Sequence, residues 1–312
     1  MSGPEAPAFG ALKPKRLDRL ILRMTCALPD TWLGLRLAIL LRRAVTMRLA
    51  KPDGALDVER FGMRMRLHPR DNGCEKNLLF TPRMYEPVEL AALGAEIARA
   101  NAAGRPFVFV DIGANVGLFS LFVAAQARPD ARIFAVEPEP GNLQRLRFNA
   151  AANPAAPIKI VPAALSDEAG ELAVELDRRD RGGSRTKKLA PSQDGAVRVE
   201  ALTLLGLLTA EALGAVDALK IDVEGAEDTI LAPFFRDAPP KLWPALIIVE
   251  DSRASWKVDL MSLLAANGYS VSVRSKQNLV LRRAIDPLAA RQSASIEEAA
   301  RIGAARPAVA TP

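Results

Sequence analysis

The feature that most limits what this chain can fold into is a repeated order of apolar segment, turn and longer segment that begins at residue 107. The apolar segments, which predict strands, are residues 107–111, 133–136, 158–162, 218–222 and 245–250. The longer segments, which predict helices, are residues 117–127, 140–152, 224–233 and 256–266. Buried strands that alternate with helices predict a mostly parallel α/β sheet with helices on both faces.

Two predicted hairpins flank this series. Residues 57–68 alternate between apolar and polar side chains and predict a short hairpin, which a helix over 83–102 follows. Near the other end, four polar residues separate the apolar segments 269–274 and 279–282. We therefore expect a Rossmann-like α/β fold whose sheet ends in an antiparallel hairpin.

A glycine-rich turn, residues 111–117 (Asp-Ile-Gly-Ala-Asn-Val-Gly), joins the first strand of the series to its helix. Glycine at such a turn lets a ligand approach the backbone closely, beside the amides of a helix. Dinucleotide sites normally have Gly-x-Gly-x-x-Gly, whereas three residues separate Gly113 from Gly117 here. Asp111 ends the strand, and an acid at this point favours a cationic ligand such as an amino group and repels a pyrophosphate.

Acids also follow the second and third strands. Glu137 lies 24 residues after Gly113, where a carboxylate can accept hydrogen bonds from both hydroxyls of a ribose; the alternative is a solvated acid at a strand end. Asp167 follows the third strand, where its side chain can bind the amino group of adenine. Aspartate is also an ordinary turn residue.

Three more acids cluster in residues 220–227 (Lys-Ile-Asp-Val-Glu-Gly-Ala-Glu), at the carboxyl end of the fourth strand. Open α/β sheets bind their ligands at this edge, and burying carboxylates without a purpose is costly. The alternative is a set of solvated acids at a helix start, which the helix dipole favours. That alternative suits Glu227 better than Asp222.

These motifs together resemble the FkbM family of S-adenosylmethionine-dependent methyltransferases, over about residues 60–283. The residues that carry the resemblance are segment 111–117, Glu137, Ser166, Asp167 and segment 220–227, joined by Tyr85-Glu86-Pro87 and Val249-Glu250. The segment 222–227 after a strand is fairly specific for the family, while the glycine turn marks only the wider superfamily. A parallel sheet with a final antiparallel hairpin also suits the class I methyltransferase fold better than a dehydrogenase.

The resemblance implies S-adenosylmethionine as the cofactor and methylation of a hydroxyl group as the reaction. The residues it implies for cofactor binding are Asp111, Gly113, Asn115, Gly117 and Glu137, with Asp167 near the adenine. The family is associated with O-methylation of natural products and saccharides, so the expected acceptor is a saccharide, a glycolipid or another small molecule. One departure is Thr203-Leu204-Leu205, where the family often has Thr-Leu-Asp; any role of that aspartate is absent here.

Transfer of a methyl group to a hydroxyl needs an acceptor held in line and a group that takes its proton. From placement, the candidates for the catalytic base are Asp222 first, then Glu224 and Glu86. Asp222 and Glu250-Asp251 end adjacent strands, and hard cations take oxygen ligands. Strand-end acids have other uses, however, so we do not expect a divalent metal, although the sequence leaves the question open.

Residue counts exclude some other chemistries. The only histidine is His68, and the two cysteines, Cys26 and Cys74, form no Cys-x-x-Cys pair. A histidine cluster is therefore excluded, and the cysteines argue against a zinc site and a disulfide framework, so we expect a cytoplasmic protein.

The sequence also allows two rival functions. A nicotinamide-dependent oxidoreductase would share Glu137 but predicts the dinucleotide glycine pattern, which is missing. A non-catalytic protein on the same fold could attach to membranes or partners through basic helices, since a fold does not establish a function. The acids at the fourth strand argue against this second rival.

Positive charge is concentrated near the start of the chain. Residues 13–51 contain ten Lys and Arg against two Asp, a net charge of +8, while the whole chain carries +6. The core is therefore not basic, and we expect no binding to nucleic acid. Residues 16–28 predict a helix with arginines beside an apolar face, and Asp30 can cap a second helix.

The apolar face predicted for this second helix consists of Leu33, Leu37, Leu40, Ala44 and Met47. No uncharged run approaches the roughly 18–20 residues that a membrane span needs. The two helices could lie on an anionic membrane surface, which would place the protein at the inner membrane face. The alternatives are a helical cap on the core or a dimer face, because an amphipathic face usually packs on protein. The sequence does not fix the oligomeric state.

The patterns divide the chain into four predicted parts. These are a basic helical extension (1–56), a lead-in hairpin and helix (57–106), the cofactor-binding domain (107–284) and a flexible tail (285–312). Within the domain, the polar residues 177–195 predict a long loop, and such loops often act as lids.

Overall fold

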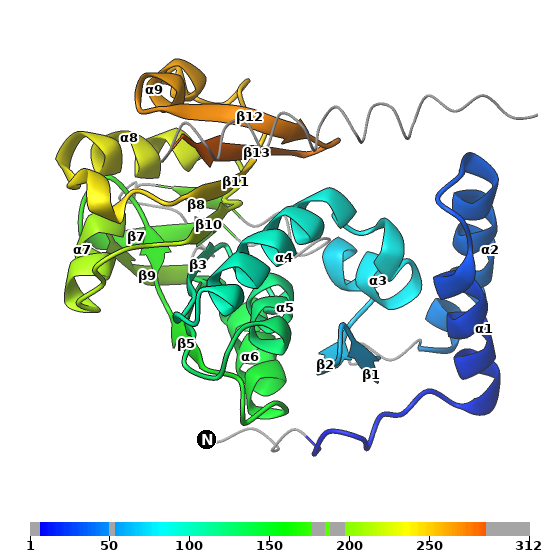
Figure 1. The fold of residues 1–312 in the computed structure, drawn as a ribbon. Helices are drawn as coiled ribbons and strands as arrows, with labels where there is room; N and C mark the ends of the chain where they lie inside the picture. Colours follow the sequence, from blue (N-terminus) through cyan, green and yellow to red (C-terminus); the bar gives the residue numbers. More distant parts are fainter. Residues whose placement is uncertain (1–6, 50–53, 176–184, 188–196, 285–312) are drawn as a thin grey trace, which may run out of the picture.

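The computed structural model of the protein describes residues 7–49, 54–175, 185–187 and 197–284 (Figure 1). Its centre is a seven-stranded sheet with the order β12-β13-β11-β10-β3-β4-β5. The strands are β3 (Val108–Ile112), β4 (Arg132–Val136), β5 (Ile158–Val161), β10 (Ala218–Ile221), β11 (Leu246–Glu250), β12 (Tyr269–Arg274) and β13 (Asn278–Arg283). The expected α/β fold with a mostly parallel sheet is confirmed.

Strand β13 is inserted between β11 and β12 and is antiparallel to both. The predicted final hairpin is therefore present, but its second strand does not form the edge of the sheet. The five strands β3, β4, β5, β10 and β11 pair in parallel, so their carboxyl ends meet along one edge. A mostly parallel sheet with antiparallel strands at one end is the arrangement that the sequence resemblance led us to expect.

Six helices are connected to this sheet. They are α4 (Pro87–Ala102), α5 (Leu118–Gln126), α6 (Pro140–Ala151), α7 (Leu204–Ala210), α8 (Glu227–Asp237) and α9 (Leu260–Ala266). Helix α8 starts three residues later than predicted, because Glu224 and Gly225 adopt positive φ angles of 57° and 102° that no α-helix contains. Helix α8 also continues past Pro233 to Asp237. Helix α7 was not predicted.

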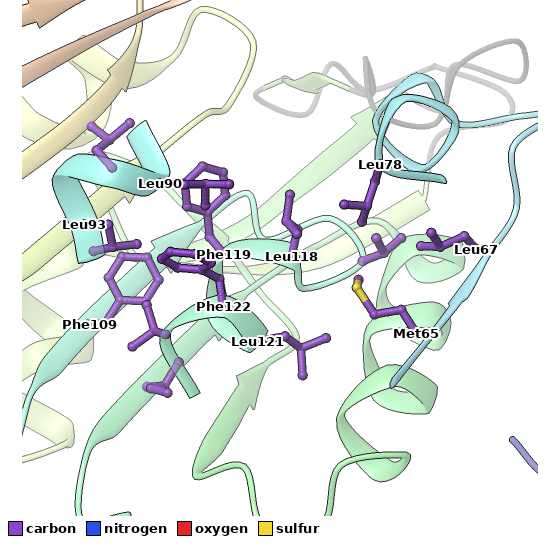
Figure 2. Close-up of a cluster of buried hydrophobic side chains, with 14 of the residues drawn as sticks. Met65, Leu67, Leu78, Leu90, Leu93, Phe109, Leu118, Phe119, Leu121 and Phe122 are labelled. Carbon is purple, nitrogen blue, oxygen red and sulfur yellow. The ribbon is translucent and has the colours of Figure 1, made fainter. Parts of the chain in front are cut away.

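Alternate residues of the strands face two separate hydrophobic cores, as the period of a strand requires. Phe109 of β3 packs with helices α4 and α5, and Figure 2 shows it beside Leu93 and Phe122. Its neighbour Val110 belongs to the opposite core, which contains side chains of α7, α8 and α9. The central strands are covered on both faces, which explains why their sequences read as continuous apolar runs.

A second sheet lies beside the first and was not predicted. Its order is β6-β9-β7-β8. The strands are β6 (Ala164–Leu165), β7 (Gly170–Glu175), β8 (Arg185–Lys187) and β9 (Val197–Leu202). Strand β8 falls inside the predicted loop 177–195 and pairs with β7; the rest of that loop lies outside the described residues, as does the predicted tail 285–312.

The region before the main sheet begins with a pair of helices. Its elements are α1 (Arg16–Ala27), α2 (Trp32–Arg48), β1 (Leu56–Arg60), β2 (Met63–Leu67), α3 (Gly73–Phe80) and the 3-10 turn η1 (Pro82–Met84); a second such turn, η3 (Pro240–Leu242), precedes β11. Helix α1 packs against α2 and α3, and Figure 1 shows α1 and α2 beyond α3, on the side away from α8 and α9. Thr31, and not Asp30, caps α2 by accepting a hydrogen bond from the amide of Gly34. Among the described residues, no helix is long and apolar enough to cross a membrane.

Candidate functional site

The loops after β3 and β10 touch each other at the carboxyl edge of the sheet. Gly113 has a φ of +75°, and a Cβ atom there would lie 1.9 Å from the carbonyl oxygen of Asp222. The amides of Gly113 and Ala114 both donate to the carbonyl oxygen of Val136, at 3.0 Å. Glycine is therefore required at this position because three strand ends meet around it, in addition to any role in admitting a ligand.

Lys220 is a buried cation at the centre of this edge. Its Nζ donates to the Asp222 carboxylate at 3.0 Å and lies 5.0 Å from the ring centroid of Phe119. In the register of β10 and β3, Lys220 is the partner of Asp111. Burial alone would lower the pKa of Lys220, but the charges of Asp222, Asp111 and Glu86 raise it above its ordinary value. The ammonium group therefore stays charged.

Asp111 is 1 % exposed and is only half satisfied by the protein. Its Oδ2 accepts hydrogen bonds from the amide and the hydroxyl of Ser120, at 3.1 and 2.7 Å. Its Oδ1 is buried and has no hydrogen-bond partner in the described part of the chain. Burial raises the pKa of Asp111, and the charge of Lys220 opposes this shift. A buried acceptor left unpaired costs about 1–3 kcal/mol. A ligand that donates a hydrogen bond to this oxygen would therefore bind favourably.

A small cavity opens in front of Asp111. Its lining includes Gly113 and Asn115 from the glycine turn, Asp222 and Lys220 from β10 and its loop, and Cys74, Leu78 and Tyr85 from the region before the sheet. The structure thus brings four of the sequence-predicted residues, Asp111, Gly113, Asn115 and Asp222, to one cavity.

Glu137 is joined to the same turn from the end of β4. Its carboxylate accepts hydrogen bonds from the amides of Asn115 and Glu139, at 2.7 and 2.9 Å. Burial raises the pKa of Glu137 to about 8, although both amides oppose the shift. A carboxylate offers about four lone-pair sites, so its oxygens can accept further hydrogen bonds from a ligand's hydroxyl groups.

Asn115 has a structural partner that the sequence did not indicate. Its side-chain oxygen accepts a hydrogen bond from Nδ2 of Asn72 at 2.8 Å. Asn72 also caps α3 by accepting from the amide of Glu75 at 3.1 Å. The glycine turn is thereby tied to the start of α3, a helix that was itself not predicted.

Gly117 and Asp167 lie outside the cavity lining, as do Glu86, Glu137 and Glu224. Gly117 has a φ of +89°, and a Cβ atom there would lie 2.5 Å from a side-chain carbon of Leu146, so it is needed where α5 approaches α6. Asp167 is half-buried after β6, and its Oδ1 accepts a hydrogen bond from the hydroxyl of Ser166 at 2.9 Å.

Glu227 has a structural role in this region. It is fully buried, and its Oε1 accepts from the amides of Val223 and Gly225 at 3.1 Å, while Oε2 accepts from Nε1 of Trp256 at 2.7 Å. It is therefore not the solvated helix-start acid that the sequence allowed. Glu227 holds the loop that carries Asp222 and Glu224.

A second group of acids lies beside Asp222. One carboxylate oxygen from each of Asp222, Glu224 and Glu250 lies within 4.8 Å of the others. Burial raises the pKa of Glu250 to about 7, and the charges of Asp222 and Glu224 add to the shift. Asp251, which the sequence paired with Glu250, instead forms ion pairs with Arg253 and Arg274, at 2.6 and 3.1 Å. By residue type the three acids could hold a divalent cation, but Asp222 already has the Lys220 ammonium as a counter-charge.

Glu86 approaches the cavity from the start of α4. It has a φ of 46° and precedes Pro87, the first residue of the helix. Its Oε2 is buried and has no hydrogen-bond partner among the described residues. Burial raises the pKa of Glu86 to about 7, an effect that the charge of Lys220 opposes and that of Asp222 increases. The side chain of Tyr85 hydrogen-bonds to Glu86, and burial raises the pKa of Tyr85, so this hydroxyl stays a neutral donor.

We expect the Lys220→Met variant to lose stability in a way that depends on pH. Removing the cation leaves buried carboxylates without a partner, a change that costs about 3–5 kcal/mol. The pKa values of Asp111 and Glu86 are already raised and would rise further. A group whose pKa is raised on folding favours the folded state at low pH, and this contribution is lost as the pH increases. Urea unfolding at pH 5 and pH 8 should therefore show the larger loss at pH 8.

The matched control is Lys257→Met, which removes an exposed cation and should change stability little at either pH. An equal loss for Lys220→Met at both pH values would contradict the assigned role of Lys220.

One family model and several known proteins match the sequence of this chain. Residues 111–271, just over half of the chain, match the family described as "Methyltransferase FkbM domain". The methyltransferase sdnD of Sordaria araneosa is 35 % identical over 144 residues, which cover 45 % of this chain and 53 % of that protein. The match therefore spans about half the length of this relative. The 31-O-demethyl-FK506 methyltransferase FkbM of Streptomyces tacrolimicus is 28 % identical over 220 residues, which cover 60 % of this chain and 81 % of that protein.

Solved structures also align with the chain. The precorrin-6y C5,15-methyltransferase of Geobacter metallireducens GS-15 aligns over 56 % of this chain and 78 % of its own, with 18 % identity and a TM-score of 0.34. A TM-score this low adds nothing to the sheet order described above.

Proposed function

The chain belongs to the FkbM family of methyltransferases, and we propose that it transfers a methyl group from S-adenosylmethionine to a hydroxyl group of a small molecule or saccharide. The observation that carries the proposal is the unpaired, buried Oδ1 of Asp111 at the cavity wall. The name of the Streptomyces relative refers to a demethylated oxygen of its substrate, which supports an oxygen acceptor.

The residues present fit this cofactor by charge. The methionine part of S-adenosylmethionine carries an ammonium and a sulfonium, so it is a cationic ligand with a single carboxylate. Around the cavity, Lys220 is one cation among the carboxylates of Asp111, Asp222 and Glu86. The surplus of negative charge favours a cationic ligand, and Oδ1 of Asp111 can accept a hydrogen bond from an ammonium group.

The remaining cofactor contacts follow from the same loops. We propose that Glu137 accepts hydrogen bonds from the ribose hydroxyls, since its carboxylate is fixed by two backbone amides and retains lone pairs. Asp167 is proposed to lie near the adenine. Asn115 is proposed to act by holding Glu137, to which its amide donates, while its side-chain oxygen accepts from Asn72.

S-adenosylmethionine supplies, when bound, a methyl group on a sulfonium that is a good leaving group. The protein's own task is to orient the acceptor and to take the hydroxyl proton. Among Asp222, Glu224 and Glu86, we now favour Glu86 as the base. A pKa of about 7 suits a base at neutral pH, and its Oε2 is unpaired, whereas the Lys220 ammonium occupies Asp222.

The rival functions make different demands. A nicotinamide-dependent oxidoreductase needs a pyrophosphate beside the glycine turn, where Asp111 is an unfavourable neighbour. A non-catalytic protein on this fold has no need for a carboxylate with a pKa of about 7 beside the cavity, because burying such a group without use costs stability.

Calorimetric titration with S-adenosylhomocysteine tests the cofactor proposal. We expect saturable binding of this ligand and none of NAD. Glu137→Gln should weaken binding about 10- to 100-fold, because the side-chain amide nitrogen cannot accept from a ribose hydroxyl and a buried polar group left unsatisfied costs about 1–3 kcal/mol. The control Glu171→Gln, at an exposed site, should bind normally. A folded wild-type sample that binds no S-adenosylhomocysteine would refute the proposal.

The role of Glu86 can be tested by its titration. In ¹³C NMR of glutamate-labelled protein, we expect two carboxyl signals with pKa values of about 7, one lost in Glu86→Gln and the other in Glu250→Gln. With an acceptor that supports turnover, kcat/KM should rise with pH through about 7, because the base acts in its deprotonated form. Glu86→Gln should lower kcat about 10²- to 10⁴-fold and remove this pH dependence. An unchanged pH profile in this variant would exclude Glu86 as the base.

A further inference from the structure

The helices α1 and α2 expose an unusual amount of apolar surface. Among the described residues, nine of the twelve exposed large apolar side chains belong to these two helices. They are Leu17, Leu20 and Met24 of α1, and Trp32, Leu33, Leu35, Leu37, Leu40 and Met47 of α2. Contiguous exposed apolar surface of this kind usually marks an interaction site.

The packing of α2 explains this exposure. Its buried positions are Gly34, Ala38 and Val45, and Leu41 packs partly against the core, so the helix packs mainly through small side chains and exposes most of its large ones. The sequence-predicted apolar face contains Leu33, Leu40 and Met47, which are 59, 61 and 72 % exposed. The large side chains of that face therefore point outward, although Ala44 of the same face and the neighbouring Val45 pack against the core.

Cationic side chains share the exposed surface of both helices. Arg16, Arg19 and Arg23 are exposed along α1, next to its leucines, and Arg36 and Arg43 are exposed on α2. The guanidinium of Arg36 lies 4.2 Å from the ring centroid of Trp32. Asp18, an acid of α1, is buried and paired with Arg48.

A basic groove of about 520 Å³ lies along the side of α2. It is lined by Ile39, Arg42, Arg43, Thr46 and Met47 of α2, and by Pro69, Arg70 and Lys76 beyond it. No carboxylate is among these lining residues. Within the described ranges, none of the four cations forms an ion pair, and burial and the charge of Arg43 lower the pKa of Arg42. Four cations in one groove without counter-charges fit a phosphorylated ligand.

The groove and the apolar surface are continuous. Arg43 and Met47 line the groove and also belong to the outward face of α2, where Met47 is 72 % exposed. A ligand that satisfies both must therefore combine a phosphate with an adjoining apolar phase.

We propose that α1 and α2 dock on a bilayer of anionic phospholipids, with a lipid phosphate headgroup in the basic groove and the apolar side chains in the interface. A tryptophan at the start of α2 suits this position, because its ring is amphipathic and prefers the membrane interface. Interfacial helices of this type combine buried apolar area with attraction to anionic lipid.

Other occupants account for fewer of the observations. A second copy of the chain would bring the same arginines of α1 and α2 against each other, and like charges at an interface are costly. A free phosphate ion would satisfy the groove but leave nine large apolar side chains in water.

Docking at this surface would bring the membrane close to the candidate site. Lys76 of α3 lines the basic groove, while Cys74 and Leu78 of the same helix line the cavity in front of Asp111. Asn72, which caps α3, binds Asn115 of the glycine turn. Helix α3 therefore lies between the lipid surface and the cavity.

Cosedimentation of the full chain with lipid vesicles tests the proposal. We expect binding to vesicles that contain phosphatidylglycerol, much weaker binding to pure phosphatidylcholine, and release by salt. The groove variant Arg42→Gln/Arg70→Gln/Lys76→Gln should weaken binding about 100-fold, since each cation near the surface contributes about 1 kcal/mol. The apolar variant Leu33→Gln/Leu40→Gln/Met47→Gln should also weaken binding, with no change in net charge.

The matched control is Arg128→Gln/Arg198→Gln/Lys257→Gln, which removes the same charge from exposed sites elsewhere. It should bind like the wild type, and unfolding curves should show that all variants are folded. An equal loss of vesicle binding in this control would show that net charge alone causes the effect of the groove variant, and would overturn the proposal. Undiminished binding by the apolar variant, with release by inorganic phosphate, would indicate a free-anion site instead. A dimer that dissociates in the apolar variant, without vesicle binding by the wild type, would assign the surface to a second copy.

Discussion

The Lys220 ammonium buried at the carboxyl edge of the sheet is the interaction on which the site depends. It is the register partner of Asp111 and the direct hydrogen-bond partner of Asp222, so it keeps two acids from adjacent strands near each other. A single cation among several carboxylates leaves the cavity with surplus negative charge. That imbalance makes a cationic ligand favourable there and leaves Oδ1 of Asp111 for it.

The region before the sheet belongs to the same arrangement. Asn72 connects α3 to the glycine turn, and Arg145 of α6 pairs with Asp71 and Glu75 near the start of the same helix. Through α3, the outward-facing helices α1 and α2 are connected to the wall of the cavity. The proposed lipid docking and the proposed methyl transfer therefore concern neighbouring surfaces, which would suit an acceptor that resides at a membrane.

The sequence predicted the features that depend on local pattern. Continuous apolar runs indicated the buried strands, and the glycine turn with the strand-end acids indicated the loops that we propose to bind the cofactor. Features set by distant partners were not predictable in this way. Lys220 is 109 residues from Asp111, and Asn72 is 43 residues from Asn115, so neither pairing leaves a local signal. A lysine inside an apolar strand was the one available indication. Leu33 and Leu40 point outward because α2 packs through the face that carries its small residues. The sequence of the helix alone does not show which face packs.

The most direct test of the central claim is a crystal structure of the protein with S-adenosylhomocysteine. We predict that the amino group of the ligand lies within hydrogen-bond distance of Oδ1 of Asp111 and that the ribose hydroxyls contact Glu137. A ligand bound elsewhere, with Oδ1 of Asp111 still unpaired beside Lys220, would contradict it.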